Sequence, residues 1–264
     1  LCGDLNNTDV LNTFVHELDV CIHLAALVSY ASPKEYHATN VLGTPNLCRA
    51  IIENNPNCKL VHCSSIAVLR RSKVLKFLNS DYANSKAQAD KCVEDCISET
   101  SLRCSFVYPG LIYGPEDTNL VPSLAKYLKA SRVVLLNGGE KDGPLIYIDD
   151  LCALFIHEAF SQETGRRYIG IGPQEVGVHG FITHLADLIG AGRPKIKLPK
   201  SLLMCIAIVL ELSYKLLNKR KFPFISKRAA DLLSINYCPK TKSQYNKDWE
   251  ATTTIEEGLS NSMQ

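Results

Sequence analysis

The sequence lacks an excess of either charge, an apolar run that could cross a bilayer, and the paired cysteines of a zinc site. Its formal net charge is +2 over 264 residues, and the basic residues are spread along the chain. This pattern gives no sign of nucleic-acid binding, which needs a basic patch or stripe. An apolar run at residues 202–210 is nine residues long, too short to span a membrane unaided.

Eleven cysteines are scattered along the chain, and none forms a C-x-x-C pair. Cys92 and Cys96 would share a helix face, but no second His or Cys pair completes a metal site. We therefore predict no bound metal. We also predict reduced thiols that pack in the interior of an intracellular, cytoplasmic protein.

The residues that are present predict an α/β protein. Apolar residues make up 46% of the chain, enough to fill one large domain with a small cap. Strands and helices alternate from residue 1 to about 130, which favours a doubly wound parallel sheet. The order is looser over 131–264, where we expect a substrate-binding cap and elements that return to the sheet. The expected strands are 19–26, 58–63 and 103–108, and the first long helix is expected at 33–55.

Ser65, Tyr82 and Lys86 carry the chemical signal. A tyrosine followed four residues later by a lysine places both side chains on one helix face. An ammonium beside a phenol favours the phenolate, so Tyr82 is predicted to give or take a proton near neutral pH. A serine at the end of the preceding strand would hold a substrate oxygen against it. Ser64 competes with Ser65 for this role.

Five further stretches surround these residues in a characteristic order. They are Gly3-Asp4-Leu5, His23-Leu-Ala-Ala26, Asn40, Pro109-Gly-Leu-Ile-Tyr-Gly-Pro115 and Tyr147-Ile-Asp-Asp150. Together with Ser65, Tyr82 and Lys86 they resemble the extended short-chain dehydrogenase/reductase family over nearly the whole chain.

The resemblance implies a cofactor, NAD or NADP, and a role for each residue. It implies that Ser65 holds the substrate oxygen, Tyr82 transfers the proton and Lys86 binds the nicotinamide ribose. Asn40 would support the proton relay. The implied cofactor contacts are Asp4 and Leu5 at the adenine, Leu24, Ala25 and Ala26 at a strand end, and Pro109, Gly110 and Ile112 beside the nicotinamide, together with Tyr82 and Lys86.

Within the family, residues 81–90 and 198–210 are similar to segments of 3β-hydroxysteroid dehydrogenase and dihydroflavonol reductase. This resemblance implies a small-molecule substrate with a secondary alcohol or ketone on a lipophilic ring system. A nucleotide-sugar epimerase or dehydratase is the alternative. Tyr108 weakens the nucleotide-sugar interpretation, because many relatives have an arginine at this position. A non-catalytic scaffold is the third interpretation.

The chain departs from the family in one respect, since it contains no G-x-x-G-x-x-G sequence. That loop presents backbone N–H groups to the cofactor pyrophosphate. The first residues already resemble the adenine-contact segment, so we expect a fragment of a longer protein that is inactive alone. The residue that would select NAD or NADP would lie in the missing part.

Two partner surfaces are expected. Residues 201–222 combine the apolar run with a short basic cluster. They are predicted either to pack on the cap or to touch a membrane surface as a monotopic helix. By analogy with the family, the helices at 34–55 and 84–100 would form a homodimer interface.

Overall fold

The structure is a computed structural model that describes residues 2–28, 31–69, 80–136, 143–173, 177–217, 225–226, 245 and 248–263. The chain forms two compact units. The first consists of Leu1–Tyr108 and Phe155–Tyr168, and the second of Pro109–Leu154 and Ile169–Gln264. We expected a division near residue 130. The chain instead leaves the first unit before Pro109, and a later segment returns to it.

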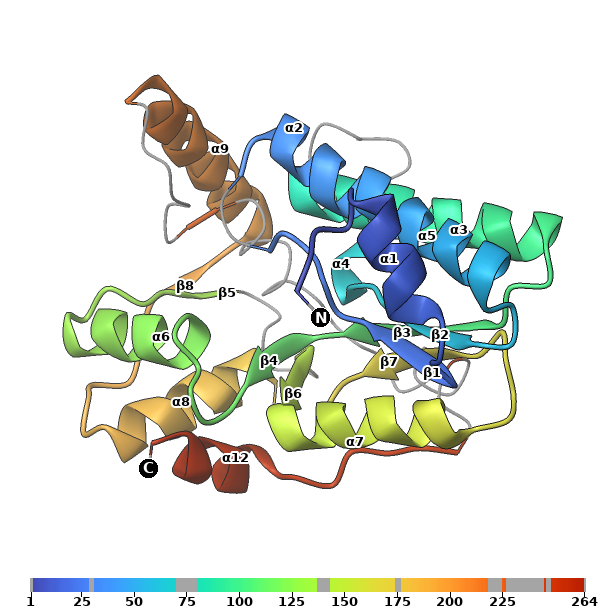
Figure 1. Ribbon diagram of the computed structural model, residues 1–264. Coiled ribbons are helices and arrows are strands. Elements are labelled where there is room, and N and C mark those ends of the chain that lie inside the picture. Colours follow the sequence, from blue (N-terminus) through green and yellow to red (C-terminus); the bar gives the residue numbers. More distant parts are fainter. Residues whose placement is uncertain are drawn as a thin grey trace. The chain divides into compact units, whose positions relative to one another are not determined.

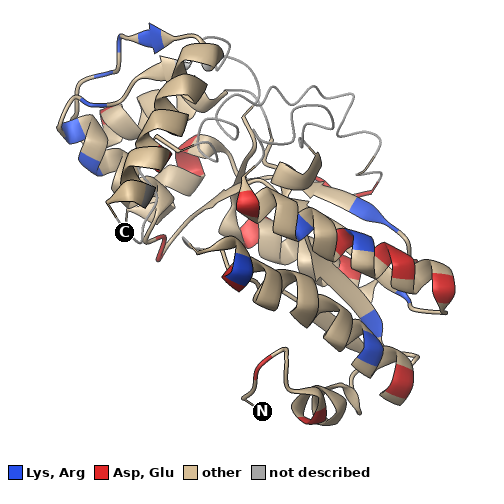
Figure 2. Ribbon diagram, turned by 90° about the horizontal axis from the view of Figure 1, so that it is seen from above, with Lys and Arg blue, Asp and Glu red and all other residues tan. Residues whose placement is uncertain are grey.

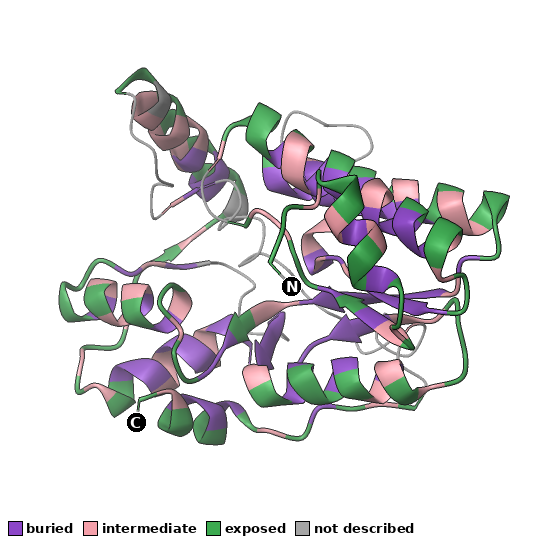
Figure 3. Ribbon diagram, viewed as in Figure 1, coloured by how far each residue is buried: buried purple, intermediate pink, exposed green. Residues whose placement is uncertain are grey.

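A four-stranded sheet organises the first unit (Figure 1). Its strand order is β1 (Val20–His23), β2 (Lys59–Cys63), β3 (Cys104–Pro109) and β7 (Arg167–Gly170). β1, β2 and β3 pair in parallel, which confirms the predicted parallel α/β sheet. Nearly all residues of β2 and β3 are buried (Figure 3), as expected for strands covered on both faces. β1 is shorter than predicted and ends at His23.

The helices of the first unit begin at the polar residues that the sequence offers as caps. Ser32 and Glu35 form a capping box at the start of the first long helix, and the Ser80 hydroxyl accepts from the Ala83 amide at 3.2 Å. Both arrangements satisfy amides that have no partner within the helix. The helices are α1 (Thr8–Val15), α2 (Pro33–Tyr36), the π-helix η1 (His37–Leu42), α3 (Gly43–Asn54), α4 (Ile66–Leu69) and α5 (Asp81–Glu99).

A buried ion pair fixes the returning segment to the sheet. The Lys59 Nζ atom lies 2.5 Å from Glu158 Oε1, and both side chains are at most 2% exposed. Lys59 also donates to the carbonyl oxygens of Glu158 and Ser161, at 2.6 and 2.9 Å. The ammonium is therefore both neutralised and hydrogen-bonded, as a buried charge must be.

The second unit has its own core and two short parallel strand pairs. The pairs join β4 (Leu111–Tyr113) to β6 (Leu145–Tyr147) and β5 (Leu135–Leu136) to β8 (Lys197–Leu198). The core packs around Tyr113, Tyr147 and Phe181. Its helices are α6 (Leu120–Lys129), α7 (Ile148–Phe160, of which Phe155–Phe160 belongs to the first unit), α8 (Val178–Leu188), α9 (Lys200–Leu216) and α12 (Ile255–Ser262).

Asp150 lies in the first turn of helix α7 and binds the stretch of chain before α12. Helix α7 already begins at Ile148, directly after β6. The Asp150 carboxylate accepts hydrogen bonds from the backbone amides of Thr252 and Thr253, at 3.2 and 3.0 Å. It therefore anchors the stretch before α12 to the first turn of α7.

The surface shows both signs of charge, and helix α9 has an exposed apolar face. Basic and acidic positions are interspersed along the helices of the first unit (Figure 2).

On α9, Leu202, Val209, Leu212 and Leu216 are 46%, 64%, 56% and 84% exposed. Among the residues that the structure describes, no helix is long and apolar enough to cross a membrane. The end of the segment predicted at 201–222 lies outside the described residues.

Candidate active site

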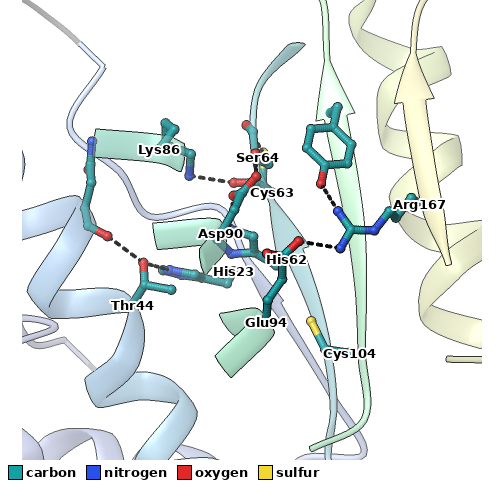
Figure 4. A network of polar contacts seen from close by, with 12 residues as sticks. His23, Thr44, His62, Cys63, Ser64, Lys86, Asp90, Glu94, Cys104 and Arg167 are labelled. Atoms are coloured by element: carbon teal, nitrogen blue, oxygen red, sulfur yellow. Dashed lines mark hydrogen bonds and ion pairs between the residues drawn. The ribbon is translucent and has the colours of Figure 1, made fainter. Parts of the chain in front are cut away.

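Lys86 is fixed to the carboxyl end of strand β2. Its Nζ atom donates to the carbonyl oxygen of Cys63, the last residue of that strand, at 2.7 Å (Figure 4). The lysine is only 3% exposed. Burial lowers the pKa of Lys86, and the nearby Cys63 thiol and Asp90 carboxylate oppose that effect. The amine therefore lies where ligands bind in doubly wound sheets, beyond the carboxyl ends of the strands.

Tyr82 lies one turn before Lys86, in the first turn of α5. The Tyr82 side chain is 7% exposed. The ring of Tyr36, from α2, packs edge-on against it with centroids 6.2 Å apart. An aromatic contact of this kind restricts the ring orientation. The structure thus places the predicted tyrosine and lysine on one helix face, as their spacing requires.

The two adjacent serines have different environments. Ser64 is 3% exposed, and its hydroxyl donates to Asp90 Oδ2 at 2.7 Å. Ser65 is half-buried. Its Oγ atom accepts from the Ala67 amide at 3.3 Å as the chain turns into α4. The proton of Ser64 is therefore donated to a carboxylate, whereas the hydrogen bond of Ser65 with the Ala67 amide uses only the oxygen of Ser65.

Asn40 lies in the π-helix η1 and is 1% exposed. Its Oδ1 atom accepts from the Leu27 amide at 2.7 Å, and its Nδ2 atom donates to the Leu27 carbonyl at 3.1 Å. Nδ2 also donates to Ser85 Oγ at 3.0 Å. Ser85 in turn donates to the Tyr82 carbonyl at 2.9 Å. Asn40 therefore links the segment after β1 to the first turn of α5.

The π-helical turn at Asn40 is stabilised by the side chains of Thr44 and of His23 from β1. The Thr44 hydroxyl donates to the Asn40 carbonyl at 2.9 Å, so its oxygen accepts from His23 Nε2 at 3.2 Å. Burial lowers the pKa of His23 to about 3, and the nearby His62 and Lys86 add to this effect. The imidazole is thus neutral, with its proton on Nε2. Short π-helical turns occur often at functional sites.

Asp90 binds two side chains at the carboxyl end of β2, His62 in the strand and Ser64 directly after it (Figure 4). His62 Nε2 lies 3.0 Å from Asp90 Oδ1, and Ser64 Oγ lies 2.7 Å from Asp90 Oδ2. Burial lowers the pKa of His62, against the opposing effect of Asp90. Our sequence analysis missed this network. The spacing of Tyr82, Lys86 and Asp90, each four residues apart, was the signal that could have revealed it.

The predicted adenine segment is fixed to the start of α3. Asp4 Oδ1 accepts from the backbone and side-chain nitrogens of Asn6, at 2.8 and 2.9 Å. The Leu5 carbonyl accepts from Asn46 Nδ2 at 3.1 Å. Leu5 packs so closely on Gly43 that a Cβ atom there would lie 2.8 Å from the Leu5 Cβ. Only a glycine permits this approach, and neither Gly43 nor Asn46 was predicted.

Leu24, Ala25 and Ala26 follow β1 without regular structure. Leu24 is 58% exposed, and Ala25 is also exposed. Leu27, the next residue, is the one that Asn40 holds. The three predicted contacts thus form an accessible, largely apolar stretch at the carboxyl end of a parallel strand.

Pro109, Gly110 and Ile112 belong to the second unit. Pro109 ends β3 and Ile112 lies in β4, where it is 43% exposed. A Cβ atom on Gly110 would overlap the carbonyl oxygen of Pro144, so a glycine is required for this close passage.

The described ranges contain no group of three or more His, Cys, Asp or Glu side chains placed to hold a metal ion. The ten cysteines that they include are unpaired thiols. Several lie in the packed interior, such as Cys48 and Cys58, each 0% exposed.

The fold and the strand-end site define a nucleotide-binding α/β protein of the doubly wound class. Residues 1–170 match the NAD dependent epimerase/dehydratase family, and the chain belongs to this family. Its members are NAD(P)-dependent oxidoreductases and epimerases of the extended short-chain type. The resemblance and the enzyme class drawn from the sequence are thereby confirmed.

Two curated relatives align with almost the whole chain. The 2-alkyl-3-oxoalkanoate reductase of Shewanella oneidensis is 27% identical over 97% of this chain and 72% of its own length. The 3beta-hydroxysteroid-dehydrogenase/decarboxylase isoform 1 of Arabidopsis thaliana is 26% identical over 96% of this chain and 63% of its own length. The chain therefore spans between 63% and 72% of the length of these two relatives.

A solved structure shows the same fold at lower identity. The UDP-glucuronic acid 4-epimerase from Bacillus cereus, in complex with NAD, has a TM-score of 0.66 and 19% identity. The similarity covers 98% of this chain and 77% of that one. Solved relatives bind NAD or NADPH.

The residues of the first unit fit the nicotinamide–ribose end of such a cofactor. The Lys86 ammonium and the Tyr82 hydroxyl are donors suited to ribose hydroxyls. Leu24 and Val28, which follow β1, are 58% and 47% exposed and offer apolar surface to a flat ring. We assign no residue to the pyrophosphate, since the sequence has no glycine-rich loop of the expected form.

Proposed function

We propose that the protein interconverts a secondary alcohol and a ketone on a lipophilic, ring-containing substrate, with Tyr82 as the proton-transfer residue. One observation carries the proposal. The Lys86 ammonium is bound to the carbonyl of Cys63 at the carboxyl end of β2, two residues before Ser65, and Tyr82 lies one helical turn before Lys86. A cation held at this strand end supports the assignment of a proton donor and a hydroxyl to the same place, as carbonyl reduction requires.

Each residue has a defined task in this mechanism. When bound, the nicotinamide supplies the hydride in reduction and accepts it in oxidation. In reduction, Tyr82 gives its phenolic proton to the substrate oxygen as the carbonyl becomes an alcohol, and in oxidation it takes that proton back. Ser65 donates its hydroxyl proton to the same oxygen and orients the substrate.

Lys86 and Asn40 support the proton transfer. An ammonium has three N–H donors, and the Cys63 carbonyl accepts from one of them. We assign the others to the ribose and to the surroundings of the phenol. Asn40 holds Ser85, which binds the carbonyl of Tyr82, so it keeps the tyrosine in place and supports the proton relay.

The substrate class is supported by the relatives and by Tyr108. The two curated relatives are named for an oxoalkanoate and a hydroxysteroid, both substantially apolar molecules. The Tyr108 hydroxyl accepts from Arg167 Nη1 at 2.6 Å and its ring is 1% exposed. It is therefore engaged inside the protein, which leaves no arginine at this position for a phosphate-bearing substrate.

The nucleotide-sugar alternative has support from the fold, because the solved relative described above is a UDP-glucuronic acid 4-epimerase. A non-catalytic scaffold is the third possibility. A panel of ketosteroids, 3-oxoalkanoates and nucleotide sugars, each with NADH and NADPH, separates the three. Turnover of the ketones alone supports our proposal, and turnover of the sugars alone contradicts it.

Tyr82→Phe tests the catalytic assignment in the full-length protein. Loss of the phenolic proton should lower kcat by about 10²–10⁴-fold, while the dissociation constant of the cofactor changes little. Ser65→Ala should cost more turnover than Ser64→Ala, which serves as the adjacent control. Wild-type turnover in Tyr82→Phe would contradict the assignment.

The exposed face of α9 supports a second part of the proposal, contact with a lipid surface from which an apolar substrate could enter. Leu202, Val209, Leu212 and Leu216 follow one another at spacings of seven, three and four residues, so they line one side of the helix. An amphipathic helix of this type lies in the membrane interface plane.

A further inference from the structure

We propose that Asp90 is a positioning residue that holds the helix carrying Tyr82 and Lys86 in register with the strand end carrying Ser65. The inference rests on the proposed function for its catalytic consequence. The contacts of Asp90 stand independently of it.

The geometry is a three-point attachment of α5 to β2. His62 and Ser64 are two residues apart at the strand end, so their side chains point to the same side of the sheet. Asp90 binds both, through its two separate oxygens. The carbonyl of Cys63, between them, accepts from Lys86. Two successive turns of one helix therefore hold the last two residues of β2 and the residue that follows them.

The attachment uses both oxygens of a buried carboxylate. Asp90 is 4% exposed, and its partners His62 and Ser64 are 0% and 3% exposed. Both partners donate a proton to it, which is the pairing that an ionised carboxylate favours. An amide at this position would turn its NH₂ group toward one of these donors. Asp90 therefore fixes the position of α5 against the end of β2, which an uncharged residue of equal size does not.

Asp90 also acts as a buried counter-charge to Lys86. Burial lowers the pKa of Lys86, whereas the charge of Asp90 raises it. The other titratable groups that face this pair are His23 from β1, His62 and Cys63 from β2, and Cys104 from β3. Burial lowers the pKa of the two histidines and raises the pKa of the two thiols, to about 11 for Cys63, so none of the four changes charge near neutral pH. Arg167 from β7 is paired with Glu94.

The consequence for catalysis follows from the position of Ser65. It is the residue directly after Ser64, so the Asp90–Ser64 bond fixes the distance between Ser65 and the face of α5 that carries Tyr82. A displacement of about 1 Å between reacting groups costs up to about 10²-fold in rate. Loss of the carboxylate should therefore reduce kcat without a matching change in KM.

The experiment compares Asp90→Asn and Asp90→Glu with Asp95→Asn in the full-length protein. Asp95 lies on the same helix but is exposed, and it pairs with Lys91 at the surface. We expect Asp90→Asn to lower kcat roughly tenfold with KM within about twofold. Asp90→Glu should restore most of the turnover, and Asp95→Asn should match the wild type.

A second readout requires no substrate. In protein labelled with ¹³C at lysine Cε, the NMR titration of Lys86, assigned with Lys86→Met, reports its pKa. Removing the opposite charge should lower the pKa of Lys86 in Asp90→Asn, and Asp90→Glu should restore it. The alkaline limb of kcat in the reductive direction should move to lower pH in Asp90→Asn and return in Asp90→Glu.

The outcomes separate this proposal from the proposed function. If Tyr82→Phe is inactive but Asp90→Asn keeps wild-type kcat and Lys86 pKa, the Asp90 proposal is wrong and the function stands. A fall in kcat with an unchanged Lys86 pKa and no rescue by glutamate indicates a purely structural role and also overturns it. If Tyr82→Phe is active, the function fails, and the Lys86 titration still decides whether Asp90 acts on the lysine.

Ser64→Ala covers the case in which Asp90→Asn fails to fold. It removes one donor and keeps the carboxylate, so we expect a fall in kcat of a few-fold at constant KM and a normal Lys86 pKa. Unchanged turnover in Ser64→Ala would overturn the proposal.

Discussion

Asn40→Ala should destabilise the protein and lower its turnover, because one buried side chain makes three hydrogen bonds to separate parts of the first unit. The variant loses the two bonds to the backbone of Leu27 and the one to Ser85. Leu27 is half-buried, so water can partly replace Asn40 there. Ser85 keeps its bond to the Tyr82 carbonyl.

The expected loss follows from these three contacts. A buried group left without its partner costs about 1–3 kcal/mol. Because water reaches Leu27 and Ser85 retains one partner, we expect a decrease of about 2 kcal/mol in the free energy of unfolding. That corresponds to roughly a 30-fold change in the unfolding equilibrium. A fall in kcat should accompany it, since the first turn of α5 is no longer held.

Urea denaturation followed by circular dichroism measures this loss. Asn54→Ala is the matched control, because Asn54 also donates two hydrogen bonds, to Asn12 and to the Ala50 carbonyl. Asn54 is exposed at the end of α3, so its loss should change the free energy by less than about 0.5 kcal/mol. If Asn40→Ala is as stable as Asn54→Ala, the contacts of Asn40 do not have the role assigned to them.

Two further predictions concern a thiol and the apolar face of α9. The hydrogen bond from Cys48 lowers the pKa of Cys96 to about 7, whereas burial raises the pKa of Cys92, one turn earlier. Iodoacetamide at pH 7 should therefore modify Cys96 before Cys92, and peptide mass spectrometry showing the reverse order would contradict this. Leu212→Glu places a charge on the exposed apolar face and should reduce co-sedimentation with lipid vesicles, with Ser201→Glu, exposed and polar, as the control. If Leu212→Glu, Ser201→Glu and the wild type co-sediment with lipid vesicles to the same extent, the membrane contact is ruled out.

The main elements of the fold were predictable because their sequence signals are local. The expected strands at 58–63 and 103–108 appear as β2, which begins one residue later, and β3, which is shifted by one residue. The helix expected at 33–55 is present, and its start is marked by the capping pair of Ser32 and Glu35. Apolar runs, capping residues and turn residues act over a few positions, so a single sequence reveals them.

The π-helical turn at Asn40 was not predictable in this way. Its carbonyl is bound by Thr44, which His23 supports from another strand. No local pattern in residues 37–42 indicates the wider turn, because the stabilising contact comes from a residue far away in the chain. The same holds for Asp150, which resembles a helix cap in sequence but binds the backbone of Thr252 and Thr253.

The sequence by itself determined the family, the parallel sheet and the choice of Ser65, Tyr82 and Lys86 as candidate residues, because a four-residue helical spacing and a strand-end serine are local facts. Only the tertiary structure showed that the Ser64 hydroxyl donates to Asp90, because that hydrogen bond joins residues 26 positions apart in the chain. It also brought Asp90, His62 and Lys86 to one strand end. The hydrogen bond of the Ser64 hydroxyl and the negative charge near Lys86 both depend on burial and on partners from distant elements. These arise only when the chain folds.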